Sequence, residues 1–252
     1  MINLGDKYFQ QANNTRGTAA VRLYVKASYE YTLSNQNEKA GLSCERSADI
    51  FLNSNLKYQA ALNYIKASDY YHNTDNVKAI ATLTTAINIL KSTKHIKLTA
   101  VNLDKLASLN RKEKRFLEAI KLYEKAYKNY KYLNMHEEAF RSFLRISNIM
   151  IQNGEYGKAI VHLEKLDQPH KDVFFDIGIL RLYINDTTVC TEFLMKQDTF
   201  MLTREYFLLN ELIVALNENN KNKFRKLLVD YHEVFSLQRW QFNLLVSVLS
   251  RM

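Results

Sequence analysis

The sequence contains little that would break a helix, with one proline and six glycines among 252 residues. Proline lacks the backbone N–H that a helix interior uses, and glycine is the default residue of irregular turns. Their scarcity argues against a fold with many long loops and favours helices that are joined by short turns. The single proline, Pro169, therefore marks the one rigid turn that we expect along the chain.

Cysteines and long apolar segments are also scarce. The two cysteines, Cys44 and Cys190, lie far apart and form no CxxC pair, so we predict no disulfide framework and expect a reducing, cytosolic setting. No run of about 18 uncharged apolar residues occurs, and residues 1–17 lack the apolar segment of a secretory signal. The sequence therefore predicts neither a membrane-spanning helix nor a secreted protein.

The motifs that usually reveal a catalytic site are missing as well. No GxGxxG or GxxxxGK[ST] loop is available to hold a phosphate, and the six histidines form no HExxH pair. His136, Glu137 and Glu138 come nearest to a site, but such a cluster is typical of the polar first turn of a helix. We therefore expect no catalysis, no metal and no cofactor.

The charge of the chain points to an anionic partner. The formal net charge is +9 and the isoelectric point is about 9.3, while 47% of the residues are hydrophobic, enough to bury a core. A basic protein of this kind can bind nucleic acid, an acidic protein surface or an anionic membrane. Composition alone does not choose among these partners.

The sequence does have a repeat of about 40 residues. The pair Ala-Ile recurs at residues 79–80, 119–120 and 159–160, and further small residues fall at the half steps, namely Ala20, Ala40, Ala60, Ala100 and Ala139. A small residue at this interval, within segments of helical periodicity, marks the close crossing of successive antiparallel helices. The period predicts an all-α fold, a TPR-like right-handed solenoid of helical hairpins followed by a C-terminal helical bundle.

We expect two domains, with hairpins in a twisted sheet over residues 1–168 and the bundle over residues 169–252. Asp75 and its polar neighbours can satisfy the free N–H groups at the start of one helix, which runs through residue 90. The other helices that the periodicity predicts lie at residues 2–12, 18–33, 37–54, 57–73, 96–109, 116–132, 136–152 and 155–166, and in the bundle at 172–184, 188–196, 203–219, 222–235 and 238–252.

Apolar and aromatic positions within these helices indicate which faces are buried. In the second helix, Val21, Tyr24, Val25, Ser28 and Tyr31 lie on one face at spacings of three and four residues. Tyrosines elsewhere, which could in principle stack on nucleic-acid bases, follow the same core spacing, and we predict that they are buried: Tyr64, Tyr71, Tyr123, Tyr127 and Tyr130.

Basic residues gather at two predicted turns and on one helix face. One cluster, at residues 91–97, includes Lys94 and Lys97, and a second lies at residues 111–115. Arg141 and Arg145 are one helical turn apart, so both guanidinium groups can reach the same partner. Solvated helix faces and turns remain the alternative interpretation of each cluster.

Several phrases occur in an order that resembles the soluble NSF-attachment protein family, specifically its alpha-SNAP and Sec17 members. These phrases are RLYVKASYEY, KYQAALNYIKASDYY, KAIATLTTAINIL, EAIKLYEKAYKNYK and YGKAIVHLEKL, and KDVFF at residues 171–175 resembles the opening of the family's C-terminal bundle. The resemblance covers nearly the whole chain. It implies an adaptor that binds SNARE complexes and recruits an NSF-type AAA+ ATPase for SNARE disassembly in vesicle fusion and transport, without being an enzyme.

The resemblance also assigns residues to the grip on an acidic SNARE four-helix bundle. Arg141 falls where the family carries an important lysine, and Arg145 matches a second basic position. A further family lysine falls near Val101, so its charge would come from Lys97 or Lys105. Together with Lys94 of the same basic turn, these residues form the predicted SNARE-binding set.

The resemblance is less complete at the two ends of the chain. Acidic residues that would dock the ATPase are Asp186, Glu205 and Glu218, and Tyr8 and Phe9 stand where family members carry bulky apolar residues that touch the membrane. Because polar residues follow Tyr8 and Phe9, we expect weak peripheral membrane contact by a cytoplasmic protein. The sequence lacks the family's acidic C-terminal tail, so we expect ATPase stimulation to be the most altered activity.

Two other functions stay open at this stage. The first is a generic TPR-like protein–protein interaction scaffold outside SNARE recycling. The second is an RNA-binding helical repeat, which would need polar side chains at fixed positions of every repeat. The positions that recur here are alanine and isoleucine, and we therefore expect no nucleic acid partner.

Overall fold

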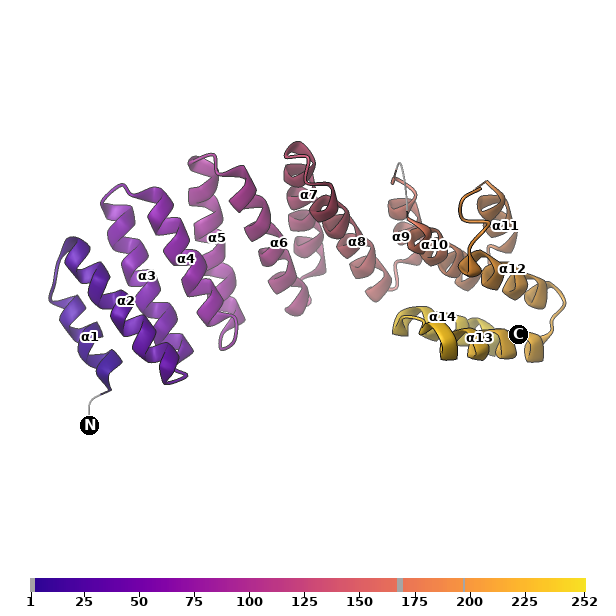
Figure 1. Ribbon diagram of the computed structural model, residues 1–252, viewed down its shortest axis with the longest axis horizontal. Coiled ribbons are helices and arrows are strands. Elements are labelled where there is room, and N and C mark those ends of the chain that lie inside the picture. Colours follow the sequence, from indigo (N-terminus) through magenta and orange to yellow (C-terminus); the bar gives the residue numbers. More distant parts are fainter. Residues whose placement is uncertain (1–2, 167–169, 197) are drawn as a thin grey trace. The chain divides into compact units, whose positions relative to one another are not determined.

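The computed structural model describes residues 3–166, 170–196 and 198–252, which contain fourteen α-helices and no strand (Figure 1). The predicted all-α fold is confirmed. The helices are α1 (Leu4–Asn13), α2 (Gly17–Leu33), α3 (Asn37–Asn53), α4 (Lys57–Tyr71), α5 (Asn76–Ser92), α6 (Ile96–Lys112), α7 (Phe116–Tyr132), α8 (His136–Gln152), α9 (Tyr156–Leu163), α10 (Lys171–Tyr183), α11 (Thr187–Met195), α12 (Arg204–Asn217), α13 (Lys221–Phe235) and α14 (Arg239–Arg251).

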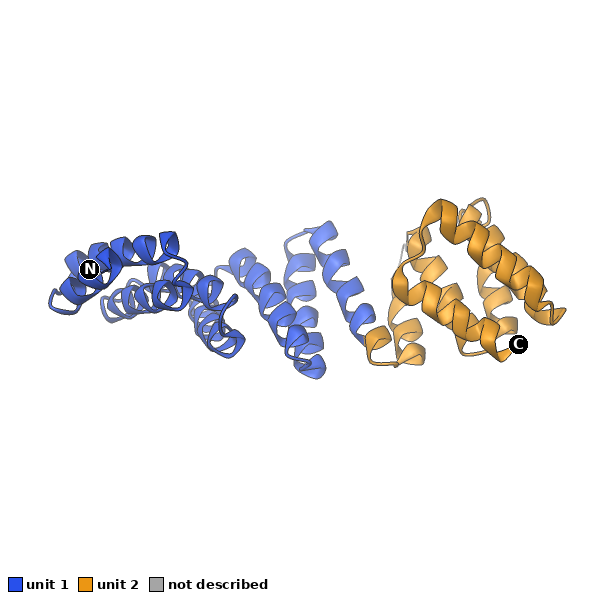
Figure 2. Ribbon diagram, turned by 90° about the horizontal axis from the view of Figure 1, so that it is seen from below, with its two compact units in different colours: residues 1–149 blue, residues 150–252 orange. Residues whose placement is uncertain are grey.

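The chain divides into two compact units, residues 1–149 and residues 150–252 (Figure 2). Every predicted helix is present, and most helix ends lie within three residues of their predicted positions. The predicted domain boundary between residues 168 and 169, and the turn at Pro169, lie outside the described residues and stay predictions. In the part of the chain that the structure describes, no helix combines the length and the apolarity that crossing a bilayer requires.

Unit 1 is a series of antiparallel helical hairpins (Figure 1). From α1 to α7 each helix packs against the next along the chain, and Tyr127 of α7 contacts Phe143 of α8. The alanines of the 40-residue repeat lie where these helices cross. Ala20, Ala40, Ala60 and Ala100 are completely buried, and Ala139 is only 4% exposed. A larger side chain at a crossing would push two helices apart, because protein interiors have almost no free volume. The predicted role of these small residues is therefore confirmed.

Two glycines serve a similar purpose that the sequence did not reveal. Gly5 of α1 faces the ring of Tyr31, and Gly41 of α3 faces the ring of Tyr71. A Cβ atom on either glycine would stand 2.7 Å from a ring carbon, closer than such atoms approach each other in proteins. Each tyrosine ring therefore packs directly on the backbone of the neighbouring helix.

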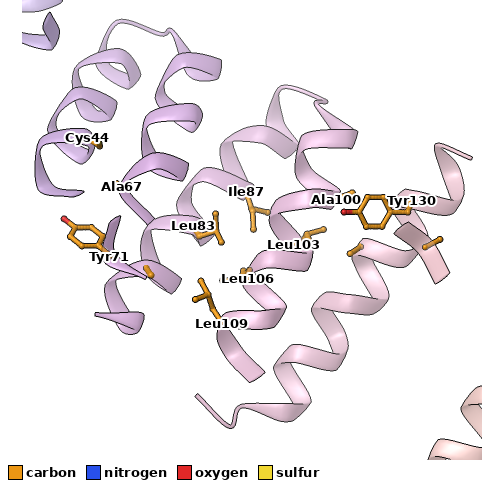
Figure 3. Close-up of a cluster of buried hydrophobic side chains, with 13 residues drawn as sticks. Cys44, Ala67, Tyr71, Leu83, Ile87, Ala100, Leu103, Leu106, Leu109 and Tyr130 are labelled. Atoms are coloured by element: carbon orange, nitrogen blue, oxygen red, sulfur yellow. The ribbon is translucent and has the colours of Figure 1, made fainter. Parts of the chain in front are cut away.

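The buried tyrosines combine apolar packing with a hydrogen bond to the preceding helix. The hydroxyl of Tyr64 donates to Asp49 (2.5 Å), and the hydroxyl of Tyr71 donates to Glu45 (2.6 Å). Burial, together with these carboxylates, raises the pKa of both tyrosines, so they remain protonated donors. The predicted burial holds for Tyr64, Tyr71, Tyr123 and Tyr130, whereas Tyr127 is only partly buried. Figure 3 shows Tyr71 and Tyr130 in one core cluster that extends from α3 to α8.

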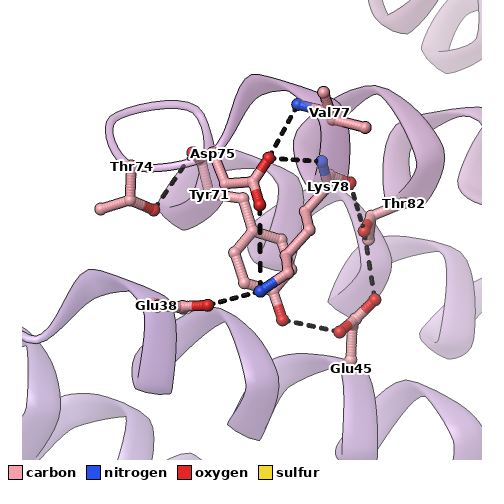
Figure 4. Close-up of polar contacts among 8 residues, drawn as sticks. All are labelled: Glu38, Glu45, Tyr71, Thr74, Asp75, Val77, Lys78 and Thr82. Atoms are coloured by element: carbon pink, nitrogen blue, oxygen red, sulfur yellow. Dashed lines mark hydrogen bonds and ion pairs between the residues drawn. The ribbon is translucent and has the colours of Figure 1, made fainter.

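Helices two apart in the chain are also linked, by ion pairs between residues that are about one repeat apart. Figure 4 shows one such link, in which Lys78 of α5 pairs with Glu38 of α3. Next to it, the carboxylate of Asp75 accepts hydrogen bonds from the N–H groups of Val77 and Lys78, which confirms the predicted cap of α5. The other inter-repeat pairs are Lys39–Asp6, Lys105–Asp69 and Arg145–Asp104.

Unit 2 is built around α10, in which eight of thirteen residues are buried. This helix contacts α9, α11, α12 and α14. Gly178 lets Leu209 of α12 approach closely, since a Cβ there would lie 2.4 Å from a methyl carbon of Leu209. At the start of α14 the side chain of Gln241 donates a hydrogen bond to Asp176 of α10 (2.7 Å), so a polar contact joins these two helices inside the unit.

Candidate partner-binding surface

The positive charge of the protein lies in unit 1. Residues 1–149 contain 23 lysines and arginines against 13 acidic residues, a net charge of +10, whereas residues 150–252 contain 12 against 13, a net charge of −1. Within unit 1, residues 91–131 alone contain 12 basic and 4 acidic residues, which gives +8. An anionic partner is therefore attracted to the stretch from the end of α5 to the end of α7.

Helix α6 presents three candidate positions as one stripe. Lys97, Val101 and Lys105 follow each other at intervals of four residues, and this spacing puts them on the same face of the helix. Lys97 and Val101 are exposed, whereas Lys105 is partly buried and pairs with Asp69 of α4. Of the two lysines that could replace the family lysine near Val101, only Lys97 lacks an ion pair among the described residues.

The two predicted arginines of α8 are engaged within unit 1. Arg141 pairs with Glu137, one turn earlier on the same helix, and both side chains are exposed. Arg145 pairs with Asp104 of α6 and lies over the ring of Tyr123, 5.7 Å from its centroid. The presentation of both guanidinium groups to one partner stays a prediction, in which the partner's carboxylates must compete with Glu137 and Asp104.

A groove adjoins Lys97, and we call it the α6 groove. Its volume is about 510 Å³, and it is lined by Tyr58, Lys94, His95, Ile96, Lys97, Leu98, Val101 and Leu133. The lining residues come from the start of α4, the α5–α6 turn, the start of α6 and the α7–α8 turn. The ring of Tyr58 lies 4.5 Å from that of His95, measured between centroids. The sequence predicted the two lysines but not the groove.

The three acidic residues predicted to dock the ATPase do not form one cluster. Asp186 pairs with Arg181 (2.9 Å), and the buried Glu205 pairs with Lys171 (2.8 Å). Glu218 is exposed just after the end of α12, about 20 Å along that helix from Glu205 at its start. Of the three, Glu218 alone is freely presented to a partner, and the docking role of all three stays a prediction.

Tyr8 and Phe9, predicted to touch a membrane, make contacts within unit 1. Phe9 packs against Tyr24, with 5.3 Å between ring centroids, and Lys26 lies over the ring of Tyr8. Both residues are partly buried. Their membrane contact stays a prediction.

A more exposed apolar stripe lies on α2. It consists of Val25, Tyr29 and Leu33, which are 54%, 62% and 64% exposed at successive intervals of four residues. The prediction that Val25 lies on the core face with Tyr24 is wrong, because adjacent residues of a helix diverge by about 100°. The spacing of the three exposed residues was visible in the sequence.

Among the described residues, no group of histidine, cysteine and acidic side chains is arranged to hold a metal ion. The two cysteines, Cys44 and Cys190, are both buried and free. Burial raises the pKa of the Cys190 thiol to about 12, so it is not a reactive thiolate.

Comparison with known proteins gives matches along most of the chain. The family model described as "Soluble NSF attachment protein, SNAP" matches residues 5–252. The alpha-soluble NSF attachment protein of Vitis vinifera is 26% identical over 243 residues, which cover 91% of this chain and 84% of that protein. The beta-soluble NSF attachment protein of Bos taurus is 22% identical over 249 residues, or 93% and 84% of the two chains. The probable vesicular-fusion protein sec17 homolog of Schizosaccharomyces pombe is 24% identical over 246 residues, or 92% and 85%.

Proposed function

The chain belongs to the soluble NSF attachment protein family, and from this premise we propose that it is a non-enzymatic adaptor in SNARE disassembly. It binds an assembled SNARE four-helix bundle and recruits an NSF-type AAA+ ATPase, at the cytoplasmic side of membranes in vesicle fusion and transport. The observation that carries this proposal is the family match over residues 5–252, and the net charge of +10 on unit 1 supports it.

Electrostatic attraction accounts for much of the proposed binding. An acidic helical bundle meets the basic stretch of unit 1, where Lys94 and Lys97 make no ion pair among the described residues. Charge pairs at a solvated interface speed association and are screened by salt. Arg141 and Arg145 join the interface by exchanging Glu137 and Asp104 for carboxylates of the bundle.

Charge reversal of the two arginines tests this proposal. Arg141→Glu combined with Arg145→Glu should weaken capture of a preassembled SNARE bundle by at least about tenfold, since two attractive pairs become repulsive. A matched control is Lys221→Glu with Arg225→Glu on α13, because these exposed residues have the same spacing of four and the same change in charge.

A neutral variant separates binding from folding. Arg145→Glu places a carboxylate beside Asp104, so it can disturb unit 1 by repulsion within the protein. Arg141→Gln with Arg145→Gln avoids that repulsion and should still weaken capture, by a smaller factor. Normal capture by both double variants, with circular dichroism unchanged, would refute the assignment of these arginines.

The ATPase-docking part of the proposal assigns Asp186, Glu205 and Glu218 to the motor. Because Asp186 and Glu205 hold ion pairs inside unit 2, Glu218→Lys is the variant that changes docking with least effect on the fold. Recruitment of the ATPase to a preformed adaptor–SNARE complex should fall. Glu233→Lys, an equally exposed position on α13, is the control and should leave recruitment unchanged.

Weak peripheral membrane contact through Tyr8 and Phe9 completes the proposal. Because Phe9 packs against Tyr24, its replacement would also disturb unit 1, so Tyr8→Ser is the better test. Co-flotation with anionic phospholipid vesicles should decrease for this variant.

If the protein binds no SNARE bundle at all, the alternative function, a TPR-like scaffold for another partner, replaces the proposed adaptor function.

A further inference from the structure

The α6 groove is lined by apolar residues and by two lysines, Lys94 and Lys97, which we call its basic rim. Tyr58, Val101 and Leu133 contribute apolar surface, and Val101 is 45% exposed although it is a β-branched aliphatic residue. Lys94 and Lys97 lie on the rim, and no carboxylate is among the lining residues. The groove therefore offers a partner exposed apolar surface together with two lysines that make no ion pair among the described residues.

The backbone at Lys94 gives an independent reason to regard this rim as functional. Among the interhelix turns that the structure describes, eight share one geometry, in which a residue with positive φ stands two positions after one helix ends and two before the next begins. This left-handed conformation is tolerated by glycine and asparagine and is unfavourable for other side chains. Six of the eight turns carry such residues, namely Asn35, Asn55, Asn134, Gly154, Asn185 and Asn219.

The other two turns carry lysine, at Lys94 with φ 59° and at Lys114 with φ 58°. Local stability alone would favour asparagine or glycine there, as in the other six turns. A strained backbone position that persists is a reason to look for a function at that residue. Lys94 has such a function available, because it lines the α6 groove, whereas Lys114 does not line it.

The spacing on α6 indicates the shape of the partner. Lys97 and Val101 are one helical turn apart, about 6 Å along the axis. A partner helix that lies along α6 can match this spacing when an apolar residue and a carboxylate are three or four positions apart, since such residues share one face. Helix-in-groove recognition of this kind uses apolar anchors for affinity and flanking charges for register.

We propose that the α6 groove receives one apolar side chain from an acidic α-helix of the partner, and that Lys94 and Lys97 bind the carboxylates next to it. This inference rests on the proposed function, in which the helix belongs to the SNARE bundle. It adds to the purely electrostatic grip an apolar contact, which salt does not screen. It also explains why lysine stands at position 94 although its backbone conformation there is unfavourable: the side chain serves binding.

Lys94→Asn gives the sharpest test, because the inference predicts opposite effects on stability and on binding. The variant should raise the thermal midpoint of unfolding, since asparagine tolerates the left-handed conformation. It should also weaken binding of a preassembled, fluorescently labelled SNARE bundle by about three- to tenfold, through loss of a charge pair. Lys114→Asn is the matched control, with the same backbone relief and the same change in charge. It should raise stability as much and weaken binding clearly less than Lys94→Asn does, because Lys114 does not line the groove.

The apolar part of the inference needs its own variants. Val101→Ser and Leu133→Ser should weaken binding most clearly at high salt, where screened charge pairs contribute least. Leu117→Ser is the control, because Leu117 is 73% exposed on α7 and does not line the groove. Circular dichroism of each variant shows whether its helices are intact.

The outcomes separate this inference from the proposed function. If the unmodified protein captures no SNARE bundle, the proposed function fails, and this inference fails with it. If the reversal of Arg141 and Arg145 abolishes capture while the variants of Lys94, Val101 and Leu133 bind like the unmodified protein, the function stands and this inference is overturned. Equal weakening by Lys94→Asn and Lys114→Asn would also overturn it, because the effect would then come from net charge alone.

Discussion

Asp176 of α10 should make the stability of unit 2 depend on pH. Burial raises the pKa of this carboxyl to about 7, even though the hydrogen bond from Gln241 (2.7 Å) lowers it, and the nearby Asp172 carboxylate raises it further. The ordinary value for the side chain is 3.8. The folded protein therefore retains a proton on Asp176 that the unfolded chain has already released.

The sign and size of the effect follow from this difference. Between about pH 4 and pH 7 the folded state binds the extra proton, so the free energy of unfolding falls as the pH rises through this window. Above pH 7 the carboxylate is ionised inside the bundle and the loss is complete. A difference of about three pKa units corresponds to about 4 kcal/mol, because each unit is worth 1.36 kcal/mol.

The variant Asp176→Asn removes the charge and keeps an oxygen that can accept the hydrogen bond from Gln241. We expect it to be more stable than the unmodified protein by about 4 kcal/mol at pH 8 and by much less at pH 5. Trp240, the only tryptophan, lies on α14 next to Gln241, so its fluorescence during urea unfolding at several pH values reports on unit 2.

The exposed Asp230 on α13 provides the matched control. Asp230→Asn makes the same chemical change in the same unit, and we expect it to leave the pH dependence of stability as it is. The reasoning would be refuted if Asp176→Asn and the unmodified protein were equally stable at pH 8, or if their unfolding curves shifted with pH in parallel.

Three further predictions concern packing, hydrogen bonding and salt. Gly41→Ala should lower the free energy of unfolding by about 1–3 kcal/mol, because the new methyl group would displace the ring of Tyr71. A Cβ atom on Gly157 would meet open space, so Gly157→Ala should instead raise the free energy of unfolding by up to about 1 kcal/mol. If urea unfolding showed changes of the same sign for Gly41→Ala and Gly157→Ala, this account would be contradicted. Tyr71→Phe should lower the free energy of unfolding by about 1–2 kcal/mol, because the Glu45 carboxylate loses the hydrogen bond from the Tyr71 hydroxyl. An unchanged urea midpoint would show that this hydrogen bond does not stabilise the protein. Capture of SNARE bundles should decline steeply as sodium chloride rises from about 50 to 300 mM, and salt-independent capture would exclude a charge-based grip.

The helical architecture could be predicted because it depends on local and periodic patterns in the sequence. Ala20, Ala40 and Ala60 recur at half the hairpin period, and only small residues fit where helices cross. The cap at Asp75 depends on residues two and three positions away in the chain. Such features need no knowledge of which helices meet, and for this reason the fold could be predicted from the sequence.

The candidate site depends on contacts that the sequence does not encode locally. Arg145 and Lys105 are recognisable as basic, but their partners Asp104 and Asp69 become apparent only when α8 lies beside α6 and α6 beside α4. The α6 groove needs Tyr58 from the start of α4 and Leu133 from the α7–α8 turn, which are far apart in the chain. Val25 was misplaced for a local reason: it directly follows Tyr24, and adjacent residues of a helix diverge by about 100°.

The interhelix turns carry a further signal that is local in the sequence. Asparagine stands between successive predicted helices at Asn35, Asn55 and Asn134, and asparagine tolerates the left-handed conformation that ends many helices. Lys94 and Lys114 occupy the equivalent position of their own turns, so an alignment of the turns on these asparagines marks both lysines as exceptions.

The measurement that tests the central claim most directly is capture of a preassembled SNARE bundle by the purified protein at about physiological salt. The capture is followed by addition of the cognate NSF-type ATPase and ATP. We predict capture in the absence of ATP and release of separated SNARE proteins once ATP is hydrolysed. Capture without release would contradict coupling to the motor. Absence of capture would contradict the proposed function itself and leave a helical-hairpin protein with a different partner.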